Sequence, residues 1–327
     1  MIPPHFSIFY WSEYIRHGAI KISYRENENW IILSEIEQSI KKKIEQVGTP
    51  LKDWDIKINR GILTGLNEAF IISKEKKDEL IKADPKSAEI IRPILRGRDI
   101  KKNEINFSEK YLIALFPSKK YNIDNYPAIK DWLINGEWVQ IKTKGNPATP
   151  IGTGKERLEQ TGKTHIVNGI KFRSRKKTSN KWFETQDSIG YWDDFNKQKI
   201  IYPNMTKYLP FYLDEDGYLS NQKAFILTGE HLYYLVSFFN SSLFKIAFNN
   251  NFPELQGGTR ELSKIYFEKI AIKKPSEELE SQIINLYKKI TSDNDFDKLL
   301  ISVDYTLSKY YNLSEDEINY LFQKYYL

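Results

Sequence analysis

Residues 58–72 read Ile-Asn-Arg-Gly-Ile-Leu-Thr-Gly-Leu-Asn-Glu-Ala-Phe-Ile-Ile. Apolar and polar residues alternate over 56–58, which is typical of a strand with one buried face, and an apolar run resumes at Ala69. Gly61 and Gly65 lie between the two runs, where we expect turns that need a positive φ. The stretch therefore predicts two extended segments joined by a glycine-containing turn.

Further strand signals continue to about residue 274. The segments 111–116 and 199–202 are apolar apart from Lys199, and each is followed by a proline, as expected for buried strands. Residues 211–213 lead into an Asp-Glu-Asp-Gly turn, and 224–227 is the predicted return strand of a hairpin. Because helical signals are interspersed, we predict a mixed α/β (α+β) domain in which strands are frequent.

Helical periodicity is clearest near the two ends of this region. Ser34 with Glu37, and Ser314 with Glu317, have the spacing of capping boxes, in which each side chain satisfies the other residue's backbone N–H. A further helix is predicted over 230–248. Apolar stripes after residue 274 predict helical hairpins, so the chain should end in a helical region.

The positive charge is concentrated in one segment. The whole chain carries a net +6, whereas residues 155–181 carry nine basic residues against two acidic ones, a net +7. Such a cluster indicates a surface that binds a polyanion. The alternative, a solvated lysine-rich loop, stays open on charge alone. The basic residues are Lys155, Arg157, Lys163, Lys171, Arg173, Arg175, Lys176, Lys177 and Lys181.

Composition excludes several classes of protein. Cysteine is absent, which removes disulfides, thiol nucleophiles and cysteine-based zinc sites. No apolar run approaches the roughly 18 residues of a membrane span, and Met1 to Phe9 does not resemble a secretion signal. We therefore expect a cytoplasmic protein with no membrane partner.

Specific residues argue against a catalytic centre in this chain. Glu156 follows Gly154-Lys155 at the position where a phosphate-binding loop needs Ser or Thr, and Arg157 replaces the third glycine of a dinucleotide fingerprint. Residues 146–149 and 202–205 approach the Asn-Pro-Pro-aromatic stretch of adenine methyltransferases, but neither matches it. The four histidines lack metal-ligand spacing. We predict no catalytic centre, no metal and no cofactor in this chain.

Two acid–lysine patterns leave a nuclease open as a minor alternative. Asp55 and Glu75 each precede a lysine by two residues, as in metal-dependent nucleases. Such triplets arise readily in a chain with 28% charged residues. A nuclease using either acid would cut DNA in the presence of magnesium.

Several segments together resemble the TaqI-like C-terminal specificity domain, the target-recognition part of adenine methyltransferases and of fused restriction-modification enzymes. The resemblance covers roughly residues 30–320. Residues 58–72 resemble the opening of the family domain, and the segments 91–100, 182–186, 199–203, 235–243 and 257–266 continue the match. It implies a domain that grips DNA opposite a methyltransferase domain and reads bases in the major groove. Residues 145–180 match no family pattern, so the resemblance assigns no base-reading residues there.

On this resemblance we predict three segments. Residues 1–33 form an N-terminal segment that ends an upstream region, 34–274 the DNA target-recognition domain, and 275–327 a helical tail. The predicted function is sequence-specific recognition of duplex DNA, without enzymatic activity, beside a methyltransferase or endonuclease domain or subunit. S-adenosylmethionine and magnesium are expected only in those absent catalytic parts. The alternative is a subunit that assembles a restriction-modification complex through its helical tail.

Particular residues follow from this prediction. Arg173, Arg175, Lys176 and Lys177 are the preferred phosphate contacts, and the rest of the basic segment, with His165, joins them. Arg60 and Arg96 are further DNA-binding candidates, whereas we expect Arg98 and Asp99 to form a structural ion pair. Gly97 is expected to serve a turn with positive φ, and Asn67 to hydrogen-bond within its own turn rather than to an adenine edge. Trp182 and Phe183 are predicted core residues.

Overall fold

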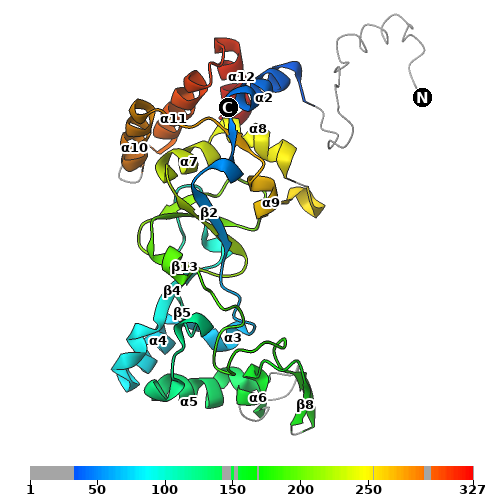
Figure 1. Cartoon of the computed structure of the whole chain (residues 1–327), viewed down its shortest axis with the longest axis vertical. Helices are drawn as coiled ribbons and strands as arrows, with labels where there is room; N and C mark the ends of the chain where they lie inside the picture. The colour runs from blue at the N-terminus through cyan, green and yellow to red at the C-terminus, as the bar shows by residue number, and fades with distance from the viewer. Residues whose placement is uncertain are drawn as a thin grey trace, which may run out of the picture. The chain divides into compact units, whose positions relative to one another are not determined.

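The computed structural model describes residues 33–141, 149–150, 154–167, 169–252, 254–290 and 296–326. They form two compact units, one of residues 55–232 and one that joins the segment up to residue 54 to residues 233–327 (Figure 1). The predicted segment 1–33 lies almost wholly outside the described residues. The compact units do not follow the predicted boundaries along the chain, and those functional boundaries stay predictions.

The first sheet of the 55–232 unit is antiparallel, in the order β12-β10-β14-β2. Its strands are β2 (Ile56–Arg60), β10 (Lys199–Pro203), β12 (Tyr212–Asp214) and β14 (Ala224–Gly229). The apolar run of β10 is buried along its whole length, as predicted, because it lies between two partner strands. The predicted hairpin of 211–213 with 224–227 is wrong, since β10 separates these two strands.

A second sheet has the order β13-β4-β5-β3. Its strands are β3 (Ile71–Ser73), β4 (Ile91–Leu95), β5 (Lys110–Ile113) and β13 (Leu219–Ser220), and β13 runs parallel to β4. The helices of this unit are α3 (Asn67–Phe70), α4 (Lys74–Ala83), α5 (Pro127–Asn135) and α6 (Gly154–Leu158). The apolar run at 69–72 thus divides between the end of α3 and the start of β3. Short strands β6 (Gln140–Ile141) and β7 (Thr149–Pro150) pair with each other.

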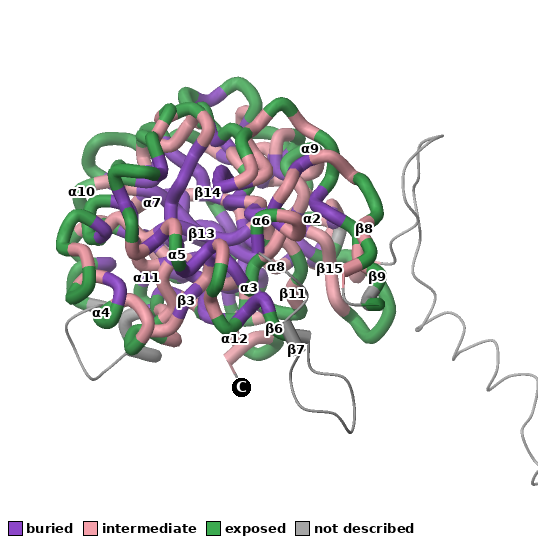
Figure 2. The backbone as a smooth tube through the Cα atoms, turned by 90° about the horizontal axis from the view of Figure 1, so that it is seen from below, coloured by how far each residue is buried: buried purple, intermediate pink, exposed green. Residues whose placement is uncertain are grey.

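One apolar core draws on strands of both sheets and on the helices α3 to α6. It includes Phe70, Leu95, Leu112 and Ile201, none of them exposed, and it extends to Phe183, with Trp182 packed against it. The predicted core positions of Trp182 and Phe183 are therefore confirmed. Figure 2 shows buried backbone, in purple, along β13 and β14.

A buried ion pair between Lys199 and Asp214 links β10 to β12. Neither side chain is exposed, and the Lys199 ammonium also donates to the carbonyl of Phe195 at 2.6 Å. Burial lowers the pKa of Lys199 and raises that of Asp214, and their mutual attraction opposes both shifts. Because a buried charge is costly without a partner, the pair ties the two strands to one register.

The other unit is mostly helical. It contains α2 (Glu35–Val47), α7 (Leu232–Phe239), α8 (Ser242–Asn251), α9 (Lys264–Phe267), α10 (Glu277–Ile290), α11 (Phe296–Tyr310) and α12 (Glu315–Tyr325), with α7 beginning at the last residue of the 55–232 unit. The helix predicted over 230–248 is interrupted at Ser241, whose hydroxyl caps α8. The strand β1 (Thr49–Pro50) pairs with β16 (Ala271–Ile272), and the short strand β15 (Arg260–Glu261) also belongs to this unit. The short strand β11 (Met205–Thr206) belongs to the 55–232 unit.

Both predicted capping boxes are present, and each also joins α2 to α12. Glu37 completes the capping box of α2 and forms an ion pair with Lys324 of α12. Glu317 completes the capping box of α12 and forms an ion pair with Lys43 of α2, with nitrogen and oxygen 2.6 Å apart. The reciprocal pairs explain why the N-terminal helix belongs to the same compact unit as the C-terminal helices.

The core of this unit is aromatic, with ring centroids 5.1 Å apart for Phe239 and Phe244 and 5.0 Å apart for Phe252 and Phe267. The mixed α/β fold with a C-terminal helical region is confirmed. Among the described helices, none has the length and apolar character needed to cross a membrane.

Candidate nucleic-acid interface

The basic segment contains a two-stranded antiparallel hairpin. Its strands are β8 (Thr164–Val167) and β9 (Ile170–Arg173), which appear beside α6 in Figure 1. Gly169 in the turn has φ +77°, a left-handed conformation that suits glycine.

The two faces of the hairpin differ in exposure. Directly opposed residues share a face, so Thr164 and Ile166 lie on the same side as Lys171 and Arg173. All four are exposed, and Ile166 is 72% exposed.

On the other face, His165 and Phe172 are half-buried, and their rings stack with centroids 5.4 Å apart. His165 Nε2 lies 3.8 Å from a carboxylate oxygen of Glu159. The predicted candidate His165 is therefore placed on the face opposite to the exposed cations of the hairpin.

The hairpin continues into its base through further backbone hydrogen bonds. The Ser174 N–H donates to the carbonyl of Lys163 at 2.9 Å, and the Gly162 N–H donates to the carbonyl of Arg175 at 2.8 Å. The Ser174 hydroxyl adds contacts to Thr161 and to the Lys163 carbonyl. The two strands are thereby held together down to Arg175.

Arg175 is buried, with 5% of its surface exposed. Its guanidinium makes five hydrogen bonds of 2.7–2.9 Å to four backbone carbonyls, two of them to Leu158 and one each to Thr64, Trp182 and Glu184. An arginine side chain has five N–H donors, so all are used. The prediction that Arg175 contacts phosphate is wrong, because its donors are turned inward.

The electrostatics of Arg175 agree with a structural role. Burial lowers its pKa to about 9, so the group stays charged at neutral pH. The guanidinium also lies over the Phe70 ring, 5.2 Å from its centroid. A buried charge needs polar partners, and here carbonyl dipoles supply most of them.

The loop after Arg175 is fixed by two amide side chains. Gln160, which is buried, donates to the carbonyls of Lys181 and Glu184 at 3.1 Å and accepts from the hydroxyl of Thr178 at 2.7 Å. Asn180 donates to the carbonyls of Thr185 and Gln186. Seven cations of the basic segment are exposed on this anchored framework: Lys155, Lys163, Lys171, Arg173, Lys176, Lys177 and Lys181.

The remaining predicted residues lie in different surroundings. Arg157 is half-buried and donates to the carbonyl of Trp138 at 3.1 Å. Arg60 is exposed, and its Nε donates to the carbonyl of Gln222 at 3.1 Å. The structure brings neither into the hairpin.

The expected pair of Arg98 with Asp99 is wrong, because Arg96 holds the carboxylate. Arg96 donates to both oxygens of Asp99, at 3.0 and 2.9 Å. Burial would raise the pKa of Asp99, but the hydrogen bonds from Arg96 outweigh it, and the pKa lies below its ordinary value. Arg98 is the exposed residue of the three. Arg96 is therefore a structural residue rather than a free phosphate contact.

Gly65 has the predicted positive φ, at +78°, and also permits a close approach. A Cβ there would lie 2.8 Å from Cδ of Arg175. Gly61 and Gly97 were expected in the same conformation, but neither has a positive φ. Both instead serve close packing, since a Cβ on Gly61 would lie 2.1 Å from the carbonyl oxygen of Asn221. Asn67 accepts from the Thr64 hydroxyl at 2.8 Å, in agreement with the turn interpretation.

No group of three or more His, Asp or Glu side chains is placed to hold a metal ion within the described ranges. Asp55 and Glu75, the acids of the nuclease alternative, thus have no gathered ligand set there.

A family model described as the TaqI-like C-terminal specificity domain matches residues 92–272, more than half of the chain. The chain belongs to this family. The match covers β4 to β16 and contains the whole basic segment, whereas residues 58–72, which resemble the opening of the family domain, precede it.

Two solved structures similar to this specificity domain come from much longer proteins. The type IIG restriction endonuclease BpuSI shares 13% identity with a TM-score of 0.48, covering 89% of this chain and 33% of that one. The type IIL restriction-modification enzyme MmeI, solved in complex with DNA, shares 12% identity with a TM-score of 0.46, covering 85% and 36%. The chain spans about a third of the length of each. The comparison with curated proteins gives no match.

The hairpin of the specificity domain is not among the predicted elements, although its signal is present in the sequence. Asn168-Gly169, flanked by Thr-His-Ile-Val and Ile-Lys-Phe-Arg, is the dipeptide typical of a two-residue hairpin turn. The strand register that this turn sets also places Ile166 on the exposed face of the hairpin.

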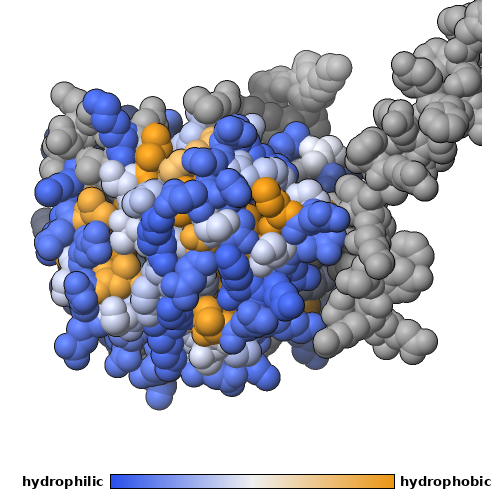
Figure 3. Space-filling view, turned by 90° about the horizontal axis from the view of Figure 1, so that it is seen from above, coloured by the Kyte–Doolittle hydropathy of each residue, from blue (hydrophilic) through white to orange (hydrophobic). Residues whose placement is uncertain are grey.

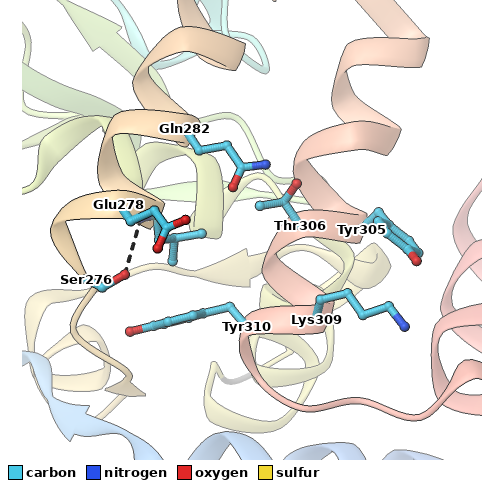
Figure 4. A pocket seen from close by; sticks show the side chains of 8 residues that line it. Ser276, Glu278, Gln282, Tyr305, Thr306, Lys309 and Tyr310 are labelled. Atoms are coloured by element: carbon cyan, nitrogen blue, oxygen red, sulfur yellow. Dashed lines mark hydrogen bonds between the residues drawn. The ribbon is translucent and has the colours of Figure 1, made fainter.

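A second surface feature lies on the helical unit of this family member. An open pocket is lined by Glu278 and Gln282 from α10 and by Tyr305, Thr306, Lys309 and Tyr310 from α11 (Figure 4). Ile301 and Tyr305 are 37% and 43% exposed. The view from above in Figure 3 shows a mainly hydrophilic surface with small separate apolar spots. Of the two charged residues that line it, Lys309 forms an ion pair with Glu315.

We expect Arg175→Lys to lower the free energy of unfolding by about 3 kcal/mol, because lysine has two fewer donors and each hydrogen bond to a charged group contributes about 1.5–3 kcal/mol. Urea unfolding followed by tryptophan fluorescence measures the change. Arg173→Lys is the matched control, since Arg173 is exposed, and it should change stability by less than about 0.5 kcal/mol. Equal effects of the two substitutions would contradict the anchoring role of Arg175.

Proposed function

We propose that this chain is the sequence-specific duplex-DNA recognition module of a restriction-modification system and acts with an adenine methyltransferase or endonuclease. The observation that carries the proposal is the set of exposed cations on a hairpin and loop that the buried Arg175 anchors. The chemistry of methyl transfer or cleavage, with S-adenosylmethionine or magnesium, would belong to the partner domain or subunit.

The placement of the charges supports DNA rather than a solvated loop. A lysine-rich loop with no ligand needs no fixed backbone, whereas this loop is held by Arg175, Gln160 and Asn180. A fixed backbone lowers the entropy lost when the side chains bind phosphates. Phosphate contacts position a protein on duplex DNA, and such contacts need exposed cations.

The hairpin also has a suitable shape for reading bases. The major groove of B-DNA admits a two-stranded β-ribbon, and its base edges distinguish all four base pairs. The exposed face of β8 and β9 would enter the groove, while Lys176, Lys177 and Lys181 would contact phosphates of the neighbouring DNA backbone. The family's description as a specificity domain agrees with this role.

The assembly alternative has an observation of its own, the exposed Ile301 and Tyr305 beside the pocket between α10 and α11. Deleting residues 275–327 would be a poor test of it. Tyr311 is buried, stacks on Phe238 and accepts from the backbone N–H of Lys273, so the deletion would remove part of the core of the helical unit.

Selection of random-sequence duplexes with the purified full chain at low salt should enrich one short motif, because base-edge contacts discriminate by about 1–3 kcal/mol each. Sequencing of the retained pool measures the enrichment. Retention without enrichment would restrict the chain to phosphate contacts. An absence of retention would reject DNA recognition and favour the assembly subunit.

Neutralising four exposed cations should flatten the salt dependence of binding. Each lost phosphate contact lowers the slope of log affinity against log salt by roughly 0.9. Fluorescence anisotropy from low to moderate salt measures the slope for a variant with glutamine at Lys171, Arg173, Lys176 and Lys177.

The matched control removes the same charge from exposed lysines elsewhere, with glutamine at Lys42, Lys288, Lys289 and Lys298. If the two variants change the slope equally, net charge rather than this segment governs binding, and the proposed interface is wrong.

A further inference from the structure

We propose that Ile166 is a specificity-determining residue that contacts the 5-methyl group of a pyrimidine, thymine in unmodified DNA, in the major groove. The inference rests on the proposed function and names one base contact within it. No other apolar side chain of the outward hairpin face competes for this role, since its other three members are Thr164, Lys171 and Arg173.

The exposure of Ile166 is the first observation. At 72% it is the most exposed isoleucine among the described residues, and it lies on a strand within a ladder rather than at a frayed end. Removing the apolar surface of an isoleucine from water is favourable. On the same hairpin, the apolar Phe172 is covered by His165 on the opposite face. The hairpin therefore places Phe172 on one face and Ile166 on the other.

The neighbours of Ile166 identify the kind of partner. Lys171 is its directly opposed residue on β9, and Arg173 is two residues further along the same face. An apolar protein surface would have to cover both cations, at a desolvation cost. Duplex DNA offers these long side chains phosphates while the isoleucine faces the groove floor.

The chemistry of the groove then selects the contact. Base edges in the major groove present hydrogen-bond donors and acceptors, and the thymine methyl is the one apolar group among them. An isoleucine placed over a donor or acceptor would leave that polar group without a partner, which is unfavourable. The minor groove presents no methyl group. Ile166 thus fits a 5-methyl group, which 5-methylcytosine also carries.

The test uses the duplex motif that the wild-type full chain enriches. Each thymine is replaced in turn by deoxyuridine, which lacks only the methyl group, and affinities are measured for wild type and Ile166→Ala. One replacement should weaken wild-type binding about fourfold, as expected for about 0.8 kcal/mol per apolar carbon, and leave the variant unchanged.

Further measurements distinguish thymine from cytosine as the contacted base and provide the control variants. If replacing cytosine by 5-methylcytosine at one position strengthens wild-type binding and not that of Ile166→Ala, the contacted base is a cytosine and the methyl chemistry still stands. Ile166→Val should keep the discrimination, and Ile301→Ala, an exposed isoleucine of α11, should behave as wild type. Because Ile166 is exposed, the variants should unfold at the wild-type urea concentration.

Equal effects of every replacement on wild type and Ile166→Ala would overturn the inference. If a motif is still enriched in that case, the proposed recognition function survives without it. If no motif is enriched from the random pool, both fall together.

Discussion

The hydrogen bonds from Arg175 to four backbone carbonyls hold together segments that are distant in the sequence. They connect the turn at Thr64, the end of α6 at Leu158 and the loop at Trp182 and Glu184. Gly65 lacks a Cβ where the arginine passes. The second strand of the hairpin ends at Arg173, two residues before Arg175, so the anchor fixes the place from which the hairpin projects. Because a buried guanidinium needs all five donors satisfied, the arrangement tolerates little change in any of these segments.

This anchor divides the basic segment into two kinds of cation. Arg175 is turned into the core, and Arg157 is partly buried against Trp138, whereas seven others face solvent. A charge held in the core cannot neutralise a phosphate. The exposed cations around it are available for a polyanion, and the anchor keeps their backbone in place before any ligand binds. Preorganisation of this kind lowers the entropic cost of association.

Features of the sequence with local causes were predictable, and features set by distant contacts were not. Both capping boxes, the buried strand β10, the concentration of positive charge and the family could be inferred from residue types and spacing. The insertion of β10 between β12 and β14 could not, because strand order depends on pairing across the chain. The burial of Arg175 could not be predicted either, because its neighbours Arg173 and Lys176 are also basic and remain exposed. Arg96 rather than Arg98 pairs with Asp99, because the turn from 96 to 99 directs the Arg96 side chain to that carboxylate.

Amide hydrogen exchange of the full chain, with and without saturating duplex DNA, tests whether the anchored hairpin and loop form the DNA-binding surface. If they do, DNA binding should slow exchange in residues 163–181 and leave exchange in α10 to α12 unchanged. Protection confined to α10, α11 and α12, with residues 163–181 unaffected, would contradict it.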